Sequence, residues 1–136
     1  MNNKTQEEEQ TLRIAQEFMG AFGSGDVKKM TELMADDMVW HNEGDKAVPW
    51  IGPWRGKNEI LKFLKIFGSN FKTLEWTPED ALVNGDTAAF FGTMNAEITR
   101  TGKKTGRFTY ALRVKVLDGK IVLWNWLEDS YAVSLA

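Results

Sequence analysis

The stretch RFTYALRVKVLDGKIVLWNWLED, residues 107–129, decides the fold of this chain. Two runs rich in β-branched and aromatic residues flank Asp118-Gly119, a dipeptide that tolerates the positive φ angles of a type I′ hairpin turn. A two-residue turn places Leu117 opposite Lys120 and thereby fixes the pairing of the whole hairpin. We therefore predict two long antiparallel strands whose side chains alternate between two faces.

This register sorts the side chains of the hairpin into an apolar face and a mixed face. The predicted apolar face holds Phe108, Tyr110, Leu112, Val114 and Val116 with Ile121, Leu123, Asn125, Leu127 and Asp129. The predicted opposite face holds Thr109, Ala111, Arg113 and Lys115 with Val122, Trp124, Trp126 and Glu128. Helices are expected to cover the apolar face, which makes Asp129 a buried carboxylate at its far end. Burial raises the pKa of an acid, which suits a general acid or base; a strand-end cap or a pairing with Lys or Arg is the alternative.

Two tryptophans on the face turned away from the helices indicate a partner. Arg113 lies beside Trp124 and Trp126 there, and a guanidinium stacks favourably on an indole. We predict a homodimer with twofold symmetry through the outer face of the sheet, because twofold dimers are the commonest assembly. The alternative is a monomer in which the stems of Lys and Arg shield the indoles.

The rest of the chain shows first helical and then strand-like patterns. Apolar residues recur at three- and four-residue spacing over 5–22, 26–35 and 58–67, which predicts three amphipathic helices. Strands are predicted at 38–42, 71–83 and 87–99, the last two joined by the hairpin signal Asn84-Gly85. Pro78 requires its strand to be bent, bulged or at a sheet edge. The predicted class is α+β, with three helices on the concave face of a curved antiparallel sheet, in a single domain over residues 1–136.

Composition excludes several classes of function. The chain has 136 residues, of which 43% are hydrophobic and 26% charged, as in ordinary globular domains. Its net charge is -2 and its basic residues are scattered, so no nucleic acid partner is expected. With no cysteine and one histidine, neither a metal nor an organic cofactor is predicted. The first ten residues lack the order of a signal peptide and no apolar run has the roughly 18 residues of a membrane span, so a cytoplasmic location is expected.

The segment ADDMVWHNEG, residues 35–44, contains the only histidine of the chain, His41. Its ordinary pKa near 6.5 suits proton transfer at neutral pH. In a regular strand Trp40 and His41 point to opposite faces, so His41 either reaches a pocket from the strand's rim or bonds to loop backbone at the surface. The following loop carries Trp50 and Trp54 beside prolines, and it is predicted to form a pocket rim or lid, or else a packed loop without ligand contact.

Five segments, in this order, resemble the SnoaL-like and ketosteroid isomerase-like proteins of the nuclear-transport-factor-two-like (NTF2-like) superfamily. They are GDVKKMTELMADDMVWHNEG (25–44), PWIGPWRGKNEILKFL (49–64), VNGDTAAFFG (83–92), TGK (101–103) and VLDGKIVLWNWLED (116–129). The resemblance implies a cone-shaped fold in which a curved sheet wraps a deep apolar pocket closed by helices. It also implies dimers formed through the outer surface of the sheet.

The resemblance further implies roles for particular residues. Polyketide cyclases of this superfamily use an aspartate on the last long strand as acid/base, and Asp129 stands at the matching place. Limonene-epoxide-hydrolase-like proteins place a tyrosine and an asparagine where this chain has Trp40 and Asn42. They place an arginine and an aspartate where it has Thr93 and Asn95, or Asn95 and Glu97 with a shifted match, so their charged triad is not intact. The tyrosine that steroid isomerases use has no counterpart in the first helix.

The sequence therefore predicts a small-molecule pocket protein of isomerase, cyclase or hydrolase type acting on an apolar, ring-containing substrate. A non-catalytic ligand-binding or dimerisation module of the same fold is the alternative. The predicted catalytic residues are Asp129 as acid/base, Asn95 and Tyr110 as donors to developing negative charge, and His41 as an auxiliary. The predicted binding residues are Phe18, Trp40, Asn42, Trp50, Trp54, Asn125 and Leu127.

Overall fold

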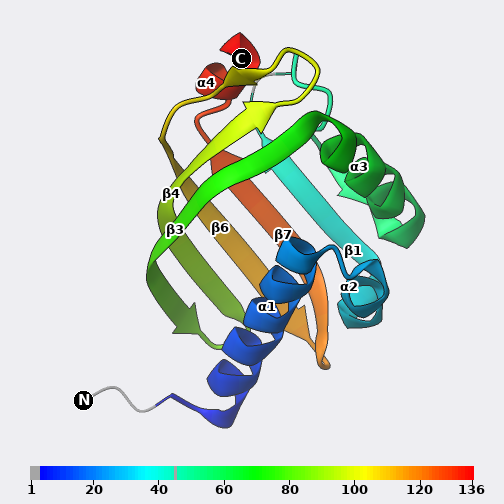
Figure 1. Cartoon of the computed structure of the whole chain (residues 1–136). Helices are drawn as coiled ribbons and strands as arrows, with labels where there is room; N and C mark the ends of the chain where they lie inside the picture. The colour runs from blue at the N-terminus through cyan, green and yellow to red at the C-terminus, as the bar shows by residue number, and fades with distance from the viewer. Residues whose placement is uncertain (1–3, 45) are drawn as a thin grey trace.

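The computed structural model describes residues 4–44 and 46–136 of the chain (Figure 1). The helices are α1 (Gln6–Ser24), α2 (Val27–Leu33), α3 (Gly56–Asn70) and α4 (Ser130–Leu135). The strands are β1 (Met34–Glu43), β2 (Trp54–Arg55), β3 (Phe71–Asn84), β4 (Thr87–Ile98), β5 (Lys103–Lys104), β6 (Phe108–Leu117) and β7 (Lys120–Glu128). The α+β class and the three helices of the first half are confirmed, whereas the short elements β2, β5 and α4 were not predicted.

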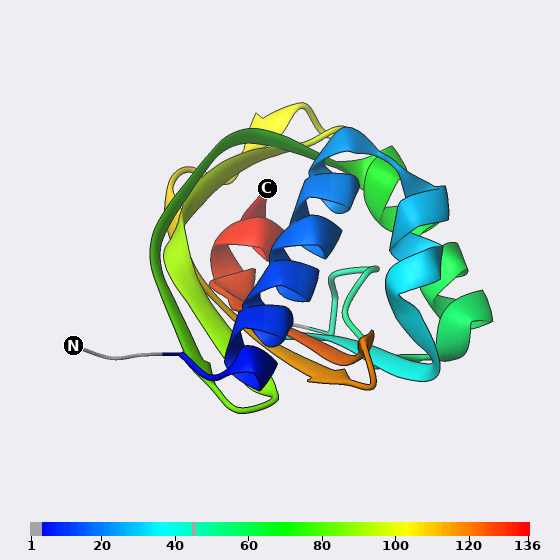
Figure 2. The same ribbon diagram turned by 90° about the horizontal axis from the view of Figure 1, so that it is seen from below.

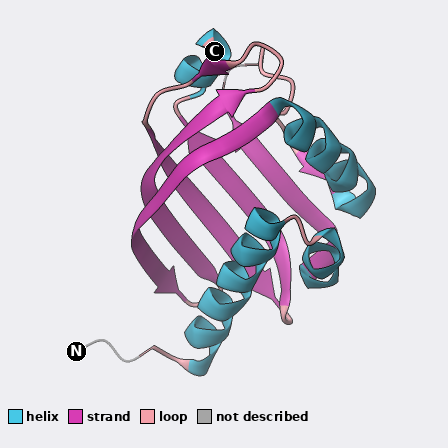
Figure 3. Cartoon of the chain, in the orientation of Figure 1, coloured by secondary structure: helices cyan, strands magenta, loops and turns pink. Residues whose placement is uncertain are grey.

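One curved sheet organises the fold. Its strands follow the order β2-β1-β7-β6-β4-β3, with β5 paired to β4. β1 runs parallel to β7 and the other pairs are antiparallel, so the sheet is mixed rather than wholly antiparallel as predicted. The strands form a curved wall that wraps around α1 (Figure 2), and the helices α1 and α3 lie against one side of it (Figure 3). We call the side that faces α1 the concave face and the other side the convex face.

Helix α1 begins at a capping box and is tied to the β3–β4 turn. The Thr5 hydroxyl accepts a hydrogen bond from the Glu8 backbone N–H, and the Glu8 carboxylate accepts one from the Thr5 N–H. The same carboxylate accepts a hydrogen bond from the N–H of Gly85 at 3.1 Å, and the Thr11 hydroxyl donates to the Gly85 carbonyl at 3.0 Å. The predicted β3–β4 hairpin is confirmed, but its turn lies one residue later than Asn84-Gly85: Asn84 pairs with Thr87, so Gly85 and Asp86 form the turn, and Gly85 takes a positive φ of 60°.

Strand β3 lies at the edge of the sheet and contains two irregularities. Its pairing with β4 shifts between Thr73 and Glu75 and again between Pro78 and Asp80. Both outcomes agree with the prediction that a strand containing Pro78 is bulged or at an edge. Among the described residues, no helix is long and apolar enough to cross a membrane.

The hairpin of β6 and β7 contains a bulge that the sequence did not indicate. The turn itself is as predicted: Asp118 and Gly119 have φ values of 51° and 76°, and Leu117 pairs with Lys120. The register then shifts, because Val116 pairs with Ile121 but Lys115 pairs with Leu123, which leaves Val122 as the extra residue. A one-residue shift moves every later side chain to the other face. The predicted faces of β7 are therefore wrong beyond Val122: Trp124, Trp126 and Glu128 lie on the concave face, and Leu123, Asn125 and Leu127 lie on the convex face.

Packing of Trp124 gives the physical reason for this bulge. The Trp124 side chain is 1% exposed, and its ring centroid lies 4.6 Å from that of Phe18 and 5.4 Å from that of Trp40. Burial of a tryptophan removes roughly 150 to 250 Å² from water, which is worth about 4 to 6 kcal/mol at ~25 cal/mol per Å². The regular register would expose this ring and turn the Asn125 amide inward, so the bulged register is favoured.

Candidate functional site

Aromatic rings pack the part of the concave face that α1 and α3 cover. Trp40 lies at the centre, with ring centroids 5.7 Å from Phe18, 4.9 Å from Phe63 and 5.4 Å from Trp124. Phe18 and Trp40 therefore lie on the predicted face, and their surroundings are other side chains of the core. The indole N–H of Trp124 is buried there and has no hydrogen-bond partner in the described part of the chain.

Asn42 holds the loop that follows β1. Its side-chain oxygen accepts a hydrogen bond from the Trp40 indole at 3.1 Å, and its amide nitrogen donates to the Trp50 carbonyl at 2.9 Å. Trp54 donates its indole N–H to the same carbonyl at 3.2 Å. Trp50 is buried, 3% exposed, and packs edge-on against Phe67, so it belongs to the core of a packed loop rather than to a mobile rim.

Polar groups gather at the other end of the concave face, where β6 begins and β7 ends. Tyr110 and Glu128 are direct cross-strand partners there. The Tyr110 ring stacks on Trp126 with a centroid distance of 4.8 Å and an interplanar angle of 7°, and the Trp126 indole donates to the Glu128 carboxylate at 3.0 Å. Directly opposed side chains lie roughly 5 Å apart at Cβ, and from there the Tyr110 hydroxyl extends over Gly92, the neighbour of Tyr110 on β4. We call Tyr110, Trp126 and Glu128 together the Tyr110–Glu128 site.

Burial shifts the pKa values of both titratable groups in this site upward. The pKa of Glu128 is raised mainly because burial disfavours the carboxylate; the hydrogen bond from Trp126 lowers it and the charge of Asp129 raises it. The pKa of Tyr110 is raised for the same main reason, while the nearby Trp76 indole lowers it and the charge of Glu79 raises it. At neutral pH the site thus combines a neutral phenol with a carboxyl group shifted toward the range of a general base.

The Tyr110 hydroxyl is a buried donor that the protein leaves unused. Tyr110 is 1% exposed, yet its hydroxyl has no hydrogen-bond partner among the residues the structure describes. Buried polar groups are nearly always paired, so this hydroxyl is a donor available to a bound molecule. Gly92, the β4 partner of Tyr110, makes room for it: a Cβ at that position would lie 2.8 Å from the phenol oxygen.

Several predicted site residues lie elsewhere. Asp129 is exposed beyond the end of β7, so the expected burial of its carboxylate is wrong, and Glu128 is the half-buried acid instead. Asn125 and Leu127 lie on the convex face because of the bulge at Val122. His41 and Asn95 also lie on the convex face, since their strand neighbours Trp40, Asn42, Met94 and Ala96 are the buried ones. The structure thus separates these side chains from Tyr110, the one predicted catalytic residue found on the concave face.

A row of hydrogen-bonded polar side chains crosses the convex face. Asn125 is buried, 4% exposed, and its side-chain oxygen accepts a hydrogen bond from the Arg113 guanidinium at 3.3 Å. Its amide nitrogen donates to the Glu43 carboxylate at 2.7 Å and to the His41 carbonyl at 3.2 Å. Arg113 is therefore on the predicted outer face, whereas Trp124 and Trp126, which were predicted beside it, are not.

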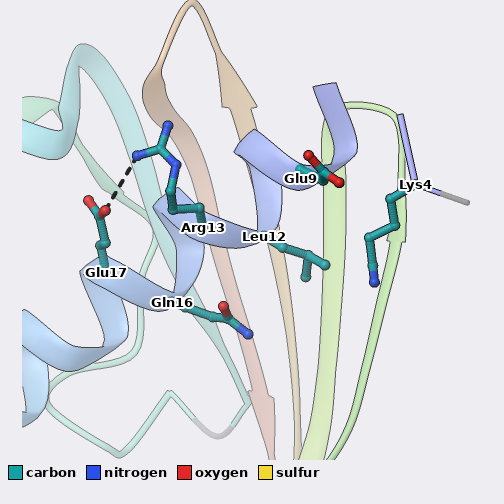
Figure 4. Close-up of a pocket in the computed structure, with 6 residues that line it drawn as sticks. All are labelled: Lys4, Glu9, Leu12, Arg13, Gln16 and Glu17. Atoms are coloured by element: carbon teal, nitrogen blue, oxygen red, sulfur yellow. Dashed lines mark hydrogen bonds and ion pairs between the residues drawn. The ribbon is translucent and has the colours of Figure 1, made fainter. Parts of the chain in front are cut away.

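A shallow recess beside α1 is separate from this site (Figure 4). Its lining residues are Lys4, Glu9, Leu12, Arg13, Gln16 and Glu17. Arg13 and Glu17 form an ion pair at 3.3 Å across one turn of the helix, and their side chains are 59% and 37% exposed. Exposed pairs of this kind contribute little to stability, and the recess shares no residue with the Tyr110–Glu128 site.

The architecture defines the class of protein: a curved sheet closed by helices, as in NTF2-like proteins. An NTF2-like protein from Burkholderia xenovorans LB400 superposes with a TM-score of 0.85 at 20% identity, covering 95% of this chain and 96% of that one. A candidate SnoaL-like polyketide cyclase from Jannaschia sp. CCS1 superposes with a TM-score of 0.81 at 13% identity, covering 100% and 96%. An epoxide hydrolase similar to limonene epoxide hydrolase, from M. tuberculosis, superposes with a TM-score of 0.74 at 21% identity, covering 95% and 85%.

The model of the SnoaL-like domain matches residues 15–124. The chain therefore belongs to the SnoaL-like domain family, as the sequence resemblance implied. No curated protein matches the chain. These three solved structures are 13% to 21% identical to it, so their likeness establishes the fold and leaves the chemistry to be argued from the site.

Sequence reasoning missed two residues that the structure brings to the site. Glu128 was assigned to the wrong face because an unbroken register was assumed for the last hairpin. Trp76 was not singled out, although it stands two residues before Pro78 in a strand already expected to be irregular. Its ring centroid lies 6.1 Å from that of Tyr110. A proline-induced bulge beside an aromatic residue was the available signal for it.

Proposed function

We propose that this protein is an acid/base enzyme of isomerase type that acts through its own side chains on an uncharged, ring-containing substrate. The observation that carries the proposal is the direct pairing of Glu128 with Tyr110, whose hydroxyl is buried and unpaired among the described residues. A carboxyl group with a raised pKa beside an unused donor is the combination that proton transfer next to a carbonyl group requires.

The two side chains divide the chemistry between them. The Glu128 carboxylate takes a proton from the carbon next to the substrate's carbonyl group, and the electron pair of that C–H bond moves toward the carbonyl oxygen. The Tyr110 hydroxyl donates a hydrogen bond to this oxygen as its negative charge develops. In a substrate with a carbon–carbon double bond β,γ to the carbonyl group, protonated Glu128 returns the proton to the γ carbon and the double bond moves to the α,β position, so the reaction is an isomerisation without net loss or gain of atoms. A donor of this kind typically contributes about 10²- to 10³-fold in rate.

The charge of the concave face supports an uncharged substrate. Its residues on β4, β6 and β7 are Ala88, Phe90, Gly92, Met94, Ala96, Ile98, Phe108, Tyr110, Leu112, Val114, Val116, Ile121, Trp124, Trp126 and Glu128. None of them is a lysine, arginine or histidine. A substrate carboxylate or phosphate would meet Glu128 there without a compensating cation, and an uncompensated buried charge is costly.

Hydrogen exchange tests the proposal with simple probes. We expect the protein to catalyse deuterium incorporation next to the carbonyl group of uncharged cyclic ketones, such as cyclohexanone and 2-tetralone, in D₂O, measured by mass spectrometry. Glu128→Gln should abolish the exchange, and Tyr110→Phe should lower its rate about 10²- to 10³-fold.

Asp129→Asn is the matched control, because Asp129 is the adjacent acid and is exposed. It should retain exchange with a much smaller loss than Glu128→Gln, since it removes only a neighbouring charge that helps to raise the pKa of Glu128. Loss of exchange in Asp129→Asn with retention in Glu128→Gln would refute the assignment of Glu128 and restore the acid predicted from the sequence.

A non-catalytic ligand-binding module is the second candidate, and the packing of the aromatic rings around Trp40 favours it. Those rings occupy the region that a deep apolar pocket would need. Under this alternative a cyclic ketone binds, as a change in tryptophan fluorescence would show, but exchanges no deuterium in the wild type.

The partner proposed for the convex face is a second copy of the chain. Phe91, Ala111 and Leu127 form a cross-strand row over β4, β6 and β7, and Phe91 and Leu127 are 38% and 41% exposed. Arg113 and Glu43 place opposite charges beside this row, as a self-complementary twofold contact needs. Sedimentation velocity should show a dimer that Phe91→Lys converts to a monomer; a wild-type monomer at micromolar concentration contradicts the proposal.

A further inference from the structure

Trp76 separates Tyr110 from solvent on the side of β3. It pairs with the concave-face residue Met94, and its ring centroid lies 6.1 Å from that of Tyr110 with an interplanar angle of 42°. Trp76 is 43% exposed, whereas Tyr110 is 1% exposed. Trp126 stacks on the Tyr110 ring with a centroid distance of 4.8 Å, so two indoles contact the phenol, and Trp76 is the more exposed of the two.

The strand that carries Trp76 is built to move more easily than its neighbours. The pairing of β3 with β4 is interrupted on both sides of Trp76, between Thr73 and Glu75 and between Pro78 and Asp80. β3 is an edge strand, and its residues 72–82 are all exposed, including those whose side chains point to the concave side. Bulges loosen a ladder, and segments with few buried contacts open at low free energy.

The contact with Gly92 places the phenol oxygen directly behind this segment. A Cβ at Gly92 would lie 2.8 Å from the Tyr110 hydroxyl oxygen and 3.0 Å from the Cα of Pro78. The hydroxyl and the backbone at Pro78 therefore share the space above one glycine. A displacement of the Trp76 side chain opens this space to the exterior, whereas displacement of Trp126 would break its hydrogen bond to Glu128.

We propose that Trp76 is the gate and the specificity-determining residue of the Tyr110–Glu128 site, admitting a planar, uncharged ring past the edge strand β3. The role of Trp76 in substrate entry rests on the proposed function, but the movement of its side chain can be tested without turnover. The indole swings outward to admit the ring and then stacks on it, so flat rings fit and bulky substituents do not. We expect this arrangement to select ligands by thickness, because an entering ring has to pass between the Trp76 indole and the Tyr110 ring.

Chemical labelling of Tyr110 measures the gate directly. The chain has two tyrosines, Tyr110 and Tyr131, so the Tyr131→Phe background leaves Tyr110 as the only one. N-acetylimidazole acetylates accessible tyrosine hydroxyls, and mass spectrometry of the Tyr110 peptide gives the rate. In this background Trp76→Ala should accelerate acetylation several-fold, and Trp76→Phe should give an intermediate rate.

Leu82→Ala is the matched control, because Leu82 is a large apolar residue of the same strand, 62% exposed and on the convex face. It should leave the acetylation rate unchanged. A wild-type rate in both Trp76 variants, with unchanged near-ultraviolet circular dichroism, overturns the proposal and moves the entrance elsewhere, for example to the end of the sheet beside α4.

Turnover provides the specificity readout. Trp76→Ala should lower KM for 2-tetralone carrying a bulky substituent relative to KM for cyclohexanone, with a smaller effect on kcat; an unchanged ratio of the two KM values contradicts the role in selection. Failure of the proposed function is distinguishable from failure of the gate, because a protein without exchange activity still reports on the gate through acetylation.

Discussion

Replacement of Trp124 by alanine decides between the bulged hairpin and the regular one. In the structure Trp124 is 1% exposed and contacts Phe18 and Trp40, so Trp124→Ala removes a large buried ring and should destabilise the fold by about 3 to 5 kcal/mol. With an unfolding entropy of roughly 2.1 cal/mol/K per residue over 136 residues, this loss lowers Tm by about 10 to 17 °C. Leu127→Ala, on the convex face and 41% exposed there, should cost less than about 1 kcal/mol.

Urea unfolding followed by far-ultraviolet circular dichroism measures both variants. The titrations should be run at two protein concentrations, because dissociation of a dimer would otherwise add to the apparent effect of Leu127→Ala. Trp124→Phe keeps a ring in the core and removes the unpaired indole N–H, so it should lose much less stability than Trp124→Ala. The regular register predicts the reverse ranking, with a costly Leu127→Ala and a nearly neutral Trp124→Ala, and that result would refute the bulge.

Three further predictions concern contacts that position the fold and the site. Hydrogen bonds from the backbone of Thr5 and Gly85 lower the pKa of Glu8 in the folded protein. The stability that Glu8 contributes is therefore present above its unfolded pKa and is lost as the pH falls through its folded pKa. Glu8→Gln should reduce the loss of unfolding free energy on acidification, and Glu9→Gln should not. Gly92→Ala places a Cβ 2.3 Å from the Thr77 carbonyl and should cost about 1 to 3 kcal/mol in a thermal melt, whereas Gly20→Ala, with nothing within 4 Å, should stabilise the helix by about 0.5 to 1 kcal/mol. Asn42→Ala leaves the Trp40 indole unpaired and removes one of the two donors to the Trp50 carbonyl, the other being Trp54, so it should cost about 1 to 3 kcal/mol in urea titrations, while the exposed Asn58→Ala should be nearly neutral.

Local chemistry made most of the fold predictable. The three helices follow from apolar spacing, and both hairpins form where an Asn-Gly and an Asp-Gly dipeptide predict them. Asp118 and Gly119 both take the positive φ of a type I′ turn, whereas in the β3–β4 hairpin Gly85 does and Asn84 does not. Pro78 correctly marked an irregular edge strand. The parallel pairing of β1 with β7 joins segments about 80 residues apart, and no short-range signal in the sequence specifies such a contact.

The candidate site was harder to predict because both faces of β7 are apolar near its start. In the run Ile121-Val122-Leu123-Trp124 every side chain is apolar, so either alternating set could face the core. The alternation of side chains alone therefore cannot place a bulge within this run. The choice is made by shape, since Trp124 fits between Phe18 and Trp40, which come from elements far away in the chain. The extra residue lies in β7 and β6 itself is regular, so the face predicted for Tyr110 on β6 is correct.

The same bulge selects which of two adjacent acids can do chemistry. Without it, Asp129 would share the concave side with Tyr110 and Glu128 would point outward among charged neighbours. With it, Glu128 lies opposite Tyr110, receives the Trp126 hydrogen bond and has its pKa raised by burial, while Asp129 adds a second negative charge that raises it further. One inserted residue thus changes the reactive group from an aspartate to a glutamate one position earlier. The pair of isosteric variants Glu128→Gln and Asp129→Asn therefore reports on the register of the hairpin and on the chemistry of the site in one experiment.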